Sequence, residues 1–178
     1  MDMMAFYGTK RILARPMTRQ EYNDYRGWTL PSDQDGSDPG FLVEYLDGGP
    51  SNHPSHAGYV SWSPESVFVN AYQPTSKMSF GHALMALKMG ACVARAGWNG
   101  KGMWIKLTPG SAFEARHAKC GHAAAARAIE LDDPEAEIEL APHIDMRAAD
   151  GTIIVGWLAS QTDLLAEDWC VVHPNAEG

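Results

Sequence analysis

The fold is decided by the stretch Met146-Arg147-Ala148-Ala149-Asp150-Gly151-Thr152-Ile153-Ile154-Val155-Gly156-Trp157-Leu158-Ala159-Ser160-Gln161-Thr162-Asp163-Leu164-Leu165-Ala166-Glu167-Asp168-Trp169. An Asp-Gly pair between apolar runs is the strongest short-range signal for a β-hairpin, because Gly151 reaches the positive φ of a tight primed turn without strain. Ser160, just before Leu164-Leu165, is typical of a helix N-cap. We therefore expect two antiparallel strands that lead into a short helix.

The same stretch gathers side chains that suit a binding site. The residues expected together at the end of the sheet are Trp157, Ser160, Gln161 and Asp163. An aromatic face beside several hydrogen-bonding groups fits a planar, polar ligand such as a nucleotide base. The structural alternatives are that Trp157 and Trp169 belong to the core and that Asp163 only caps the helix.

The amino-acid composition limits which classes of protein this chain can belong to. With 178 residues and 45% apolar content, the chain can bury a core as one large domain or two small ones. Its 14 Lys and Arg against 22 Asp and Glu leave a net charge of −8, which favours solubility and repels polyanions. We therefore expect no DNA or RNA partner.

The chain also lacks membrane signals. No apolar run approaches the ~20 residues that span a bilayer. Residues 1–6 lack a basic segment followed by a long apolar one, as a secretory signal would require. We expect a cytoplasmic protein with no membrane partner.

The cysteines and histidines do not predict a metal centre. Three widely spaced cysteines argue against a disulfide framework and against paired-thiolate motifs; they are Cys92, Cys120 and Cys170. His53 and His56 lie in a predicted loop with no Cys or carboxylate at ligand spacing, so we interpret them as surface histidines. The group His117, Cys120 and His122 lacks a fourth ligand. We expect neither metal nor cofactor.

The first 75 residues predict a small module. A short strand runs from about residue 7 to residue 14, and Thr18 with Glu21 forms a capping box for a helix that Gly27 ends. Strands follow at 41–46 and 59–62. A second helix is expected after Ser63, as N-cap, and Pro64, at its first position. The turn residues 73–76 form the predicted boundary between modules 1–75 and 76–178.

The second module begins with a helix. Phe80, Ala83, Leu84 and Leu87 recur at the spacing of an amphipathic helix that ends near Gly90. Met85 and Met89 fall on its opposite side. That second apolar surface either packs against another subunit or consists of tolerated surface methionines.

A glycine-rich turn joins the strands expected at 91–95 and 103–108. Trp98 offers a stacking face, and Asn99 offers hydrogen bonds to a base or ribose. Arg95 or Lys101 could bind a phosphate. The structural alternative is a β-hairpin with a bulge and no ligand.

We expect residues 110–141 to form an insertion between two strands of the sheet. Ser111 and Glu114 form a second capping box before an alanine-rich helix, and 135–140 alternates as a half-exposed strand with an acidic outer face. In the next strand, His143, Asp145 and Arg147 share one face, which either meets solvent or lines a site. There the carboxylate could bind ribose hydroxyls and the guanidinium a phosphate.

Together these elements predict an α+β fold. We expect antiparallel sheets with short helices packed on one face, arranged as two small modules.

Three motifs in order carry a resemblance to a known family. They are 79–88 (Ser79-Phe80-Gly81-His82-Ala83-Leu84-Met85-Ala86-Leu87-Lys88), 95–103 (Arg95-Ala96-Gly97-Trp98-Asn99-Gly100-Lys101-Gly102-Met103) and 157–169, quoted above. Residues 78–173 thereby resemble a phage family that includes the second type of Thoeris anti-defence protein. Residues 1–75 look like a small module common in phage proteins. The chain departs from the compact family core by that module and by the 110–141 segment.

The resemblance implies a function. Members of that family sequester the cyclised ADP-ribose signal of bacterial immunity, and some trap cyclic dinucleotides, as homo-oligomers whose pockets lie between subunits. It implies a non-enzymatic dimer or tetramer in the bacterial host cytoplasm, with a cyclic nucleotide as its partner.

The residues we assign to this ligand are Arg95, Trp98, Asn99, Lys101, Asp145, Trp157, Ser160, Gln161 and Asp163. No catalytic residue is assigned. The sequence contains no G-x-S-x-G, H-E-x-x-H or Walker motif. The first alternative is a cyclic-nucleotide hydrolase that uses Asp145 with His143, which share a strand face. The second is a phage structural or protein-binding adaptor.

Overall fold

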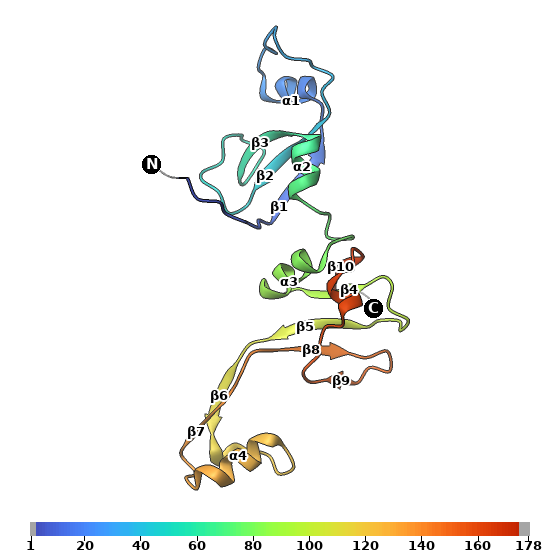
Figure 1. The fold of residues 1–178 in the computed structure, drawn as a ribbon. Coiled ribbons are helices and arrows are strands. Elements are labelled where there is room, and N and C mark those ends of the chain that lie inside the picture. The colour runs from blue at the N-terminus through green and yellow to red at the C-terminus, as the bar shows by residue number, and fades with distance from the viewer. Residues whose placement is uncertain (1–2, 175–178) are drawn as a thin grey trace. The chain divides into compact units, whose positions relative to one another are not determined.

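A computed structural model describes residues 3–174. The chain divides into two compact units, Met1–Gln73 and Pro74–Gly178. Each unit contains an antiparallel sheet with short helices (Figure 1), so the α+β prediction is confirmed. None of the helices in residues 3–174 has the length and apolar character needed to cross a membrane.

The N-terminal unit is built on a sheet of order β1-β2-β3. Its elements are β1 (Ile12–Pro16), α1 (Arg19–Arg26), β2 (Gly40–Tyr45), β3 (Tyr59–Pro64) and α2 (Glu65–Ala71). Helix α1 begins with the predicted capping box, in which the Glu21 N–H donates to Thr18 Oγ1 at 3.2 Å and the Thr18 N–H donates to Glu21 Oε2 at 2.7 Å. It ends at Gly27, whose φ of 68° closes the helix.

Two local predictions in this unit are wrong. Strand β1 starts at Ile12 rather than near residue 7. Ser63 does not cap α2, because it still pairs with Phe41 across the sheet, and the cap position falls on Pro64. The core of the unit consists of Met17, Tyr22, Leu42 and Val60.

The C-terminal unit contains a five-stranded sheet of order β10-β4-β5-β8-β9. Its strands are β4 (Cys92–Arg95), β5 (Trp104–Thr108), β8 (His143–Arg147), β9 (Ile153–Ile154) and β10 (Trp169–Val172). Helix α3 (Phe80–Lys88) packs on β4, β5 and β10, and α5 (Gln161–Leu164) packs on α3. The buried core residues are Met78, Ala83, Leu87, Val93, Ile105, Met146, Ala166 and Trp169.

The hairpin β8–β9 forms at the predicted Asp-Gly pair. Gly151 has a φ of 90°, and its N–H donates to the Ala148 carbonyl at 3.0 Å. The Ala148 N–H in turn donates to the Thr152 carbonyl at 2.8 Å, so three residues lie inside the closing pair. The connection is thus one residue longer than the predicted two-residue turn.

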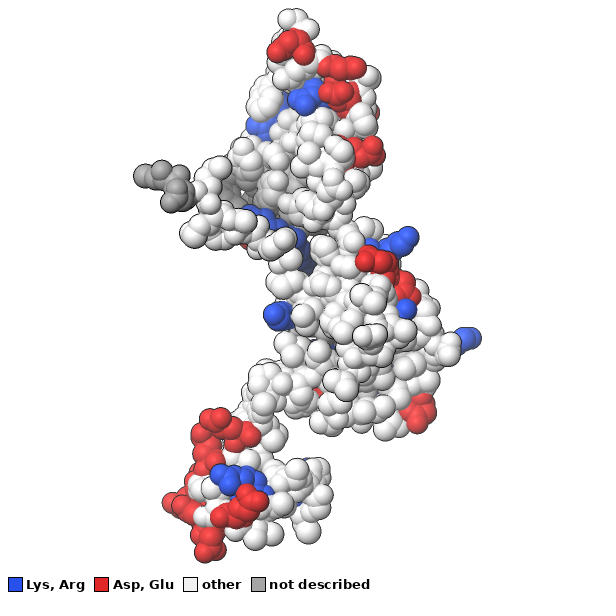
Figure 2. Space-filling view, viewed as in Figure 1, with Lys and Arg blue, Asp and Glu red and all other residues white. Residues whose placement is uncertain are grey.

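Between β5 and β8 the chain forms an arm, residues 109–142. It contains β6 (Ser111–Glu114), the 3₁₀ helix η1 (Ala115–His117), α4 (Ala123–Leu131) and β7 (Glu137–Leu140). The predicted capping box at Ser111 is wrong, because Ser111–Glu114 pairs with β7 as a strand. Figure 2 shows acidic side chains gathered on this arm.

Candidate functional site

Three indole rings and one phenyl ring form an aromatic cluster in the C-terminal unit. The centroid of Trp169, which is fully buried, lies 5.4 Å from that of Trp98, 6.1 Å from that of Trp157 and 5.4 Å from that of Phe80. Trp98 and Trp157 meet edge to face at 6.3 Å, and both are half-buried. The rings predicted to stack on a ligand therefore lie side by side, with Trp169 packed against both.

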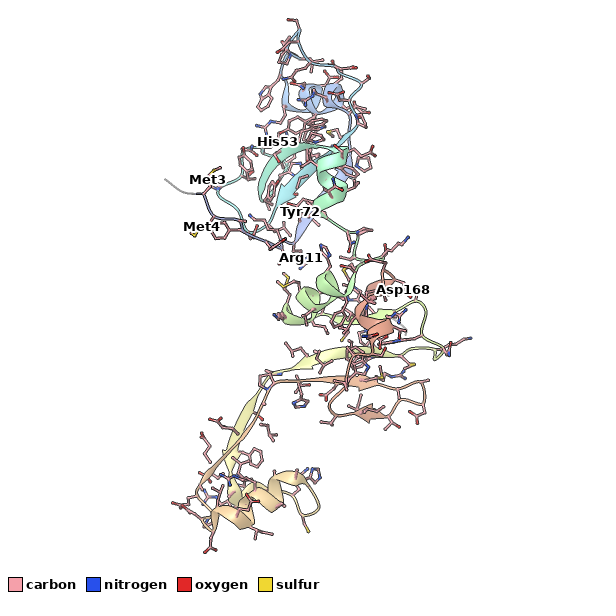
Figure 3. All side chains as sticks on the ribbon, in the orientation of Figure 1. Met3, Met4, Arg11, His53, Tyr72 and Asp168 are labelled. Carbon is pink, nitrogen blue, oxygen red and sulfur yellow. The ribbon has the colours of Figure 1, made fainter. Side chains whose placement is uncertain are left out.

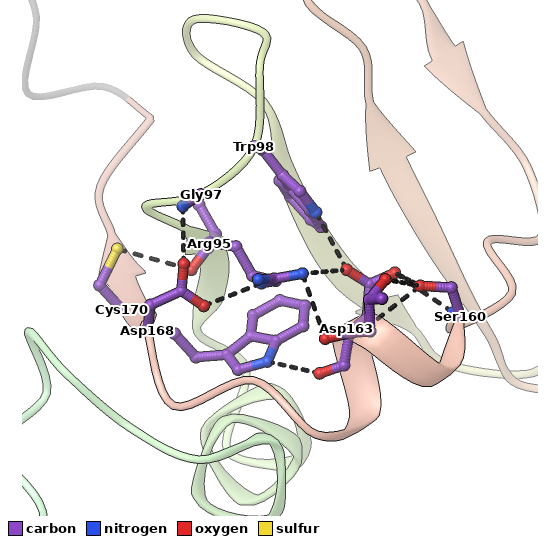
Figure 4. Close-up of polar contacts among 10 residues, drawn as sticks. Arg95, Gly97, Trp98, Ser160, Asp163, Asp168 and Cys170 are labelled. Carbon is purple, nitrogen blue, oxygen red and sulfur yellow. Dashed lines mark hydrogen bonds and ion pairs between the residues drawn. The ribbon is translucent and has the colours of Figure 1, made fainter.

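Asp163, on α5, is the polar centre beneath this aromatic cluster (Figure 4). Its Oδ1 accepts the Trp98 indole N–H at 3.2 Å and an Arg95 N–H at 2.9 Å. Its Oδ2 accepts the hydroxyl of Ser160 at 2.7 Å, as part of a capping box for this helix, whose N-cap was predicted at Ser160. Its backbone carbonyl accepts the Trp169 indole N–H at 3.0 Å. The carboxylate is buried and saturated, so it positions Trp98 and Ser160.

Arg95, at the end of β4, joins two carboxylates. Its Nε donates to Asp168 Oδ1 at 2.8 Å, and its Nη1 donates to Asp163. The second oxygen of Asp168 accepts the Gly97 N–H at 2.6 Å, which holds the turn before Trp98. The Arg95 side chain is 17% exposed, so its guanidinium is engaged inside the protein rather than free for a phosphate.

This network sets the charges at the site. Burial alone would raise the pKa of Asp163, but hydrogen bonds from Ser160, Arg95 and Trp98 outweigh it and lower the pKa from 3.8 to about 2. Hydrogen bonds to Asp168 and Asp163 raise the pKa of Arg95. The Arg95 guanidinium likewise lowers the pKa of Asp168. All three groups are therefore charged at neutral pH.

Exposed polar side chains lie on the two segments that the network joins. Asn99 and Lys101 are exposed in the turn after Trp98, and Gln161 is exposed at the first position of α5. Within the described residues these three side chains make no hydrogen bond. They are free to meet a ligand, whereas the Ser160 hydroxyl is shared between Asp163 and Thr162.

Asp145 belongs to a separate polar group on β8. It accepts hydrogen bonds from the Thr108 hydroxyl and, at 3.3 Å, from the Gly156 N–H. The His143 Nε2 lies 3.5 Å from its Oδ1. Arg147, on the same face, donates instead to the Gly102 carbonyl at 2.7 Å. The predicted polar row therefore consists of groups held by neighbouring strands and turns.

Sequence reasoning gave Asp168 no role, although it completes the site. It lies 73 residues from Arg95 along the chain, and only the pairing of β4 with β10 brings the two together. Asp168 lies directly before strand β10, which starts at Trp169, and four residues after α5 ends at Leu164. The sequence signal that could have identified Asp168 is a carboxylate placed between a predicted helix and a predicted strand.

The described residues hold no group of three His, Cys, Asp or Glu side chains placed to bind a metal. Cys92 and Cys170 are free thiols in β4 and β10, and burial raises the pKa of both. Cys120 is free and exposed in the arm.

Comparison with known proteins identifies the C-terminal unit. The model of the Thoeris anti-defense 2-like domain family matches residues 78–172. Thoeris anti-defense 2 of Bacillus phage SP01 is 38% identical over 97 residues, which are 54% of this chain and 97% of that protein. The matched range holds the whole aromatic cluster and the Arg95–Asp163–Asp168 network. The chain therefore belongs to the Thoeris anti-defense 2-like family.

Proposed function

We propose that this protein is a phage anti-defence protein that binds a cyclic nucleotide signal of Thoeris immunity and withholds it without cleaving it. The family supports a role against Thoeris. The observation that carries the binding mechanism is the pair of half-buried indoles Trp98 and Trp157, which meet edge to face, with Trp98 held by Asp163. The exposed side chains of Asn99, Lys101 and Gln161 make no hydrogen bond within residues 3–174. The ligand is a cyclic ADP-ribose isomer or a cyclic dinucleotide.

The chemistry of these side chains suits such a ligand. An indole stacks on a base, an amide reads its edge or the ribose, and an ammonium group pairs with phosphate. A protein that acts by stoichiometric capture needs a site formed in advance, because ordering side chains on binding lowers the affinity. The bonds from Asp163 to Trp98 and Ser160 supply that rigidity.

The protein acts as a homo-oligomer in this proposal. Exposed apolar side chains recur from β9 to the residue after α5: Ile153, Ile154, Val155, Leu158, Leu164 and Leu165. Such a concentration of exposed apolar groups favours burial against another copy. We expect Leu158→Asp to shift the protein toward monomer in sedimentation velocity. Ile129→Asp, at another highly exposed apolar position in α4, should leave the assembly unchanged, and an equal effect of both variants would contradict this interface.

The central experiment separates capture from cleavage. The protein is incubated with a cyclic ADP-ribose isomer, washed, and heat-denatured, and the released small molecules are identified by mass spectrometry. We expect the intact ligand in stoichiometric amount. Trp98→Phe weakens binding in calorimetry by about tenfold, while the control Trp104→Phe, outside the aromatic cluster, binds as the parent does. Release of products instead of ligand refutes sequestration.

One observation favours a second candidate, a hydrolase. His143 and Asp145 lie within reach of each other on β8, as an acid–base pair would. In that case the same experiment yields products, and His143→Gln abolishes them. A protein-binding adaptor is the outcome if no cyclic nucleotide raises the thermal midpoint, since a tight ligand stabilises the folded state.

A further inference from the structure

A buried carboxylate in the N-terminal unit is connected to a phenol through an imidazole. Glu44, on β2, is 8% exposed, and its Oε2 lies 2.8 Å from His56 Nδ1. The other oxygen accepts the Gly58 N–H at 2.9 Å. The His56 Nε2 lies 2.9 Å from Tyr25 Oη, on α1. We call Tyr25, His56 and Glu44 the tyrosine triad.

The direction of these hydrogen bonds follows from the ionised carboxylate. Hydrogen bonds from His56 and Gly58 lower the pKa of Glu44, so it is an acceptor only. His56 therefore carries a proton on Nδ1, and in the neutral ring the Nε2 lone pair accepts the Tyr25 O–H. The same hydroxyl also lies 3.5 Å from His53 Nδ1. A hydroxyl, a base that accepts from it and a third group that orients the base are the arrangement of an activated nucleophile.

The loop 51–56 places further polar groups beside the triad. The His53 ring stacks on Tyr25 with centroids 4.5 Å apart, and its Nδ1 accepts the Ser55 N–H at 3.2 Å. The neutral ring therefore has its proton on Nε2, which has no partner in residues 3–174. The surface here is a shallow, open depression (His53 is labelled in Figure 3), lined by Ser51, Asn52, His53, Pro54 and His56, and Tyr25 lies at its side against His53 and His56.

A cation lies against the same phenol ring. The Arg15 guanidinium carbon is 5.2 Å from the Tyr25 ring centroid. Within the described part of the chain Arg15 forms no ion pair, and its charge contributes to lowering the pKa of Glu21. A guanidinium and a free imidazole N–H beside a phenol favour an anionic substrate, and a guanidinium binds a phosphate through two parallel hydrogen bonds.

We propose that Tyr25 is the nucleophile of a second site, which acts on a phosphate ester bound by Arg15 and His53. The Tyr25 oxygen forms a bond to phosphorus while the bond from phosphorus to the leaving oxygen breaks. The phenol proton passes to His56 Nε2 and then to the leaving oxygen, which departs as an alcohol. Water that His56 deprotonates next cleaves the phosphotyrosine bond and restores the phenol. Glu44 is a positioning residue that orients His56.

The test uses the full chain and bis(p-nitrophenyl) phosphate. We expect release of p-nitrophenol and, in rapidly quenched samples, a p-nitrophenyl phosphoryl adduct that tandem mass spectrometry places on Tyr25. Tyr25→Phe keeps the ring stacked on His53 but removes the oxygen, and it abolishes both signals. Glu44→Gln lowers the rate by about 100-fold or more.

Rescue by a conservative variant distinguishes positioning from packing. Glu44→Asp keeps an anion beside His56 and should retain part of the turnover that Glu44→Gln loses. A purely structural role for Glu44 would make the two variants lose turnover alike.

Two controls keep the proposal refutable. Tyr7 is fully exposed, so Tyr7→Phe should leave turnover unchanged and Tyr7 should carry no adduct. Circular dichroism and the thermal midpoint establish that each variant is folded. As an independent measurement, an aryl sulfonyl fluoride should label Tyr25 faster than Tyr7 in the parent protein. Turnover that survives Tyr25→Phe, or labelling of Tyr25 no faster than Tyr7, overturns the proposal and leaves a structural hydrogen-bond network.

Discussion

Asp163→Asn tests the central claim that one ionised carboxylate organises the candidate site. The substitution keeps the size of the side chain and removes its charge. A pKa lowered from 3.8 to about 2 corresponds, at about 1.4 kcal/mol per pKa unit, to about 2 kcal/mol of stability. Because the carboxylate is only 12% exposed, solvent screens little of this. We expect the free energy of unfolding of the C-terminal unit to fall by about that amount at neutral pH.

The pH dependence gives the prediction its sign. The folded-state pKa is depressed, so the stabilisation is complete above the unfolded value of 3.8 and disappears as the pH falls through about 2. Urea unfolding followed by tryptophan fluorescence, at a series of pH values, measures the gap between the parent and Asp163→Asn. That gap should close across this acidic window.

A matched control is Glu130→Gln, whose carboxylate is 65% exposed in an ion pair with Arg127 on α4. Its loss should change the stability by less than about 1 kcal/mol. If Asp163→Asn unfolds at the same urea concentration as the parent at neutral pH, Asp163 is not the organising group. A gap that is constant from neutral to strongly acidic pH would contradict the electrostatic origin of the effect.

Three further substitutions test other parts of the fold. Arg95→Lys replaces a planar fork that joins two carboxylates by a single ammonium group, so chemical denaturation should show a loss of about 1–3 kcal/mol; an unchanged midpoint would mean that one contact suffices. Gly97→Ala places a Cβ 2.8 Å from Asp168 Oδ2, so calorimetry should show a lower thermal midpoint, which a neutral result would contradict. Thr18→Ala removes the N-cap of α1 and should lower the stability of the N-terminal unit by about 1 kcal/mol in urea, whereas the exposed neighbour Gln20→Ala should not reproduce that loss of a cap.

The sequence predicted best those features that depend on neighbouring residues. The capping box at Thr18, the N-cap at Ser160 and the helix over Phe80–Lys88 arise from contacts within a few positions, so a local pattern contains the whole cause. Family resemblance added what local patterns could not. The match over residues 78–172 confirms the family predicted from three short motifs.

The failures have a common physical origin in long-range pairing. Ser111 and Glu114 satisfy the capping-box pattern, but pairing of β6 with β7 sets Phe113 opposite the buried Ile138 and overrides it. In the same way, Ser63 stays in strand β3 because it pairs with Phe41 of β2, and so it does not cap α2.

The candidate site was only partly visible in the sequence. Trp98 and Trp157 were predicted near each other, and the structure brings them together. The carboxylates that engage Arg95 lie 68 and 73 residues further along the chain, and no local pattern contains that information. Interpreting Arg95 and Asp163 as ligand-binding groups treated them as solitary charges, whereas the fold pairs them with each other.

The arm offers a practical consequence. Its two ends leave the sheet at Thr108 and His143, which are paired partners in the β5–β8 ladder, so the chain exits and returns at adjacent points. A short turn could close that gap, and a variant shortened in this way should keep the strand order of the sheet. Equally, a foreign peptide or a fluorescent reporter could be spliced in there, turning the protein into a sensor for whatever its aromatic rings hold.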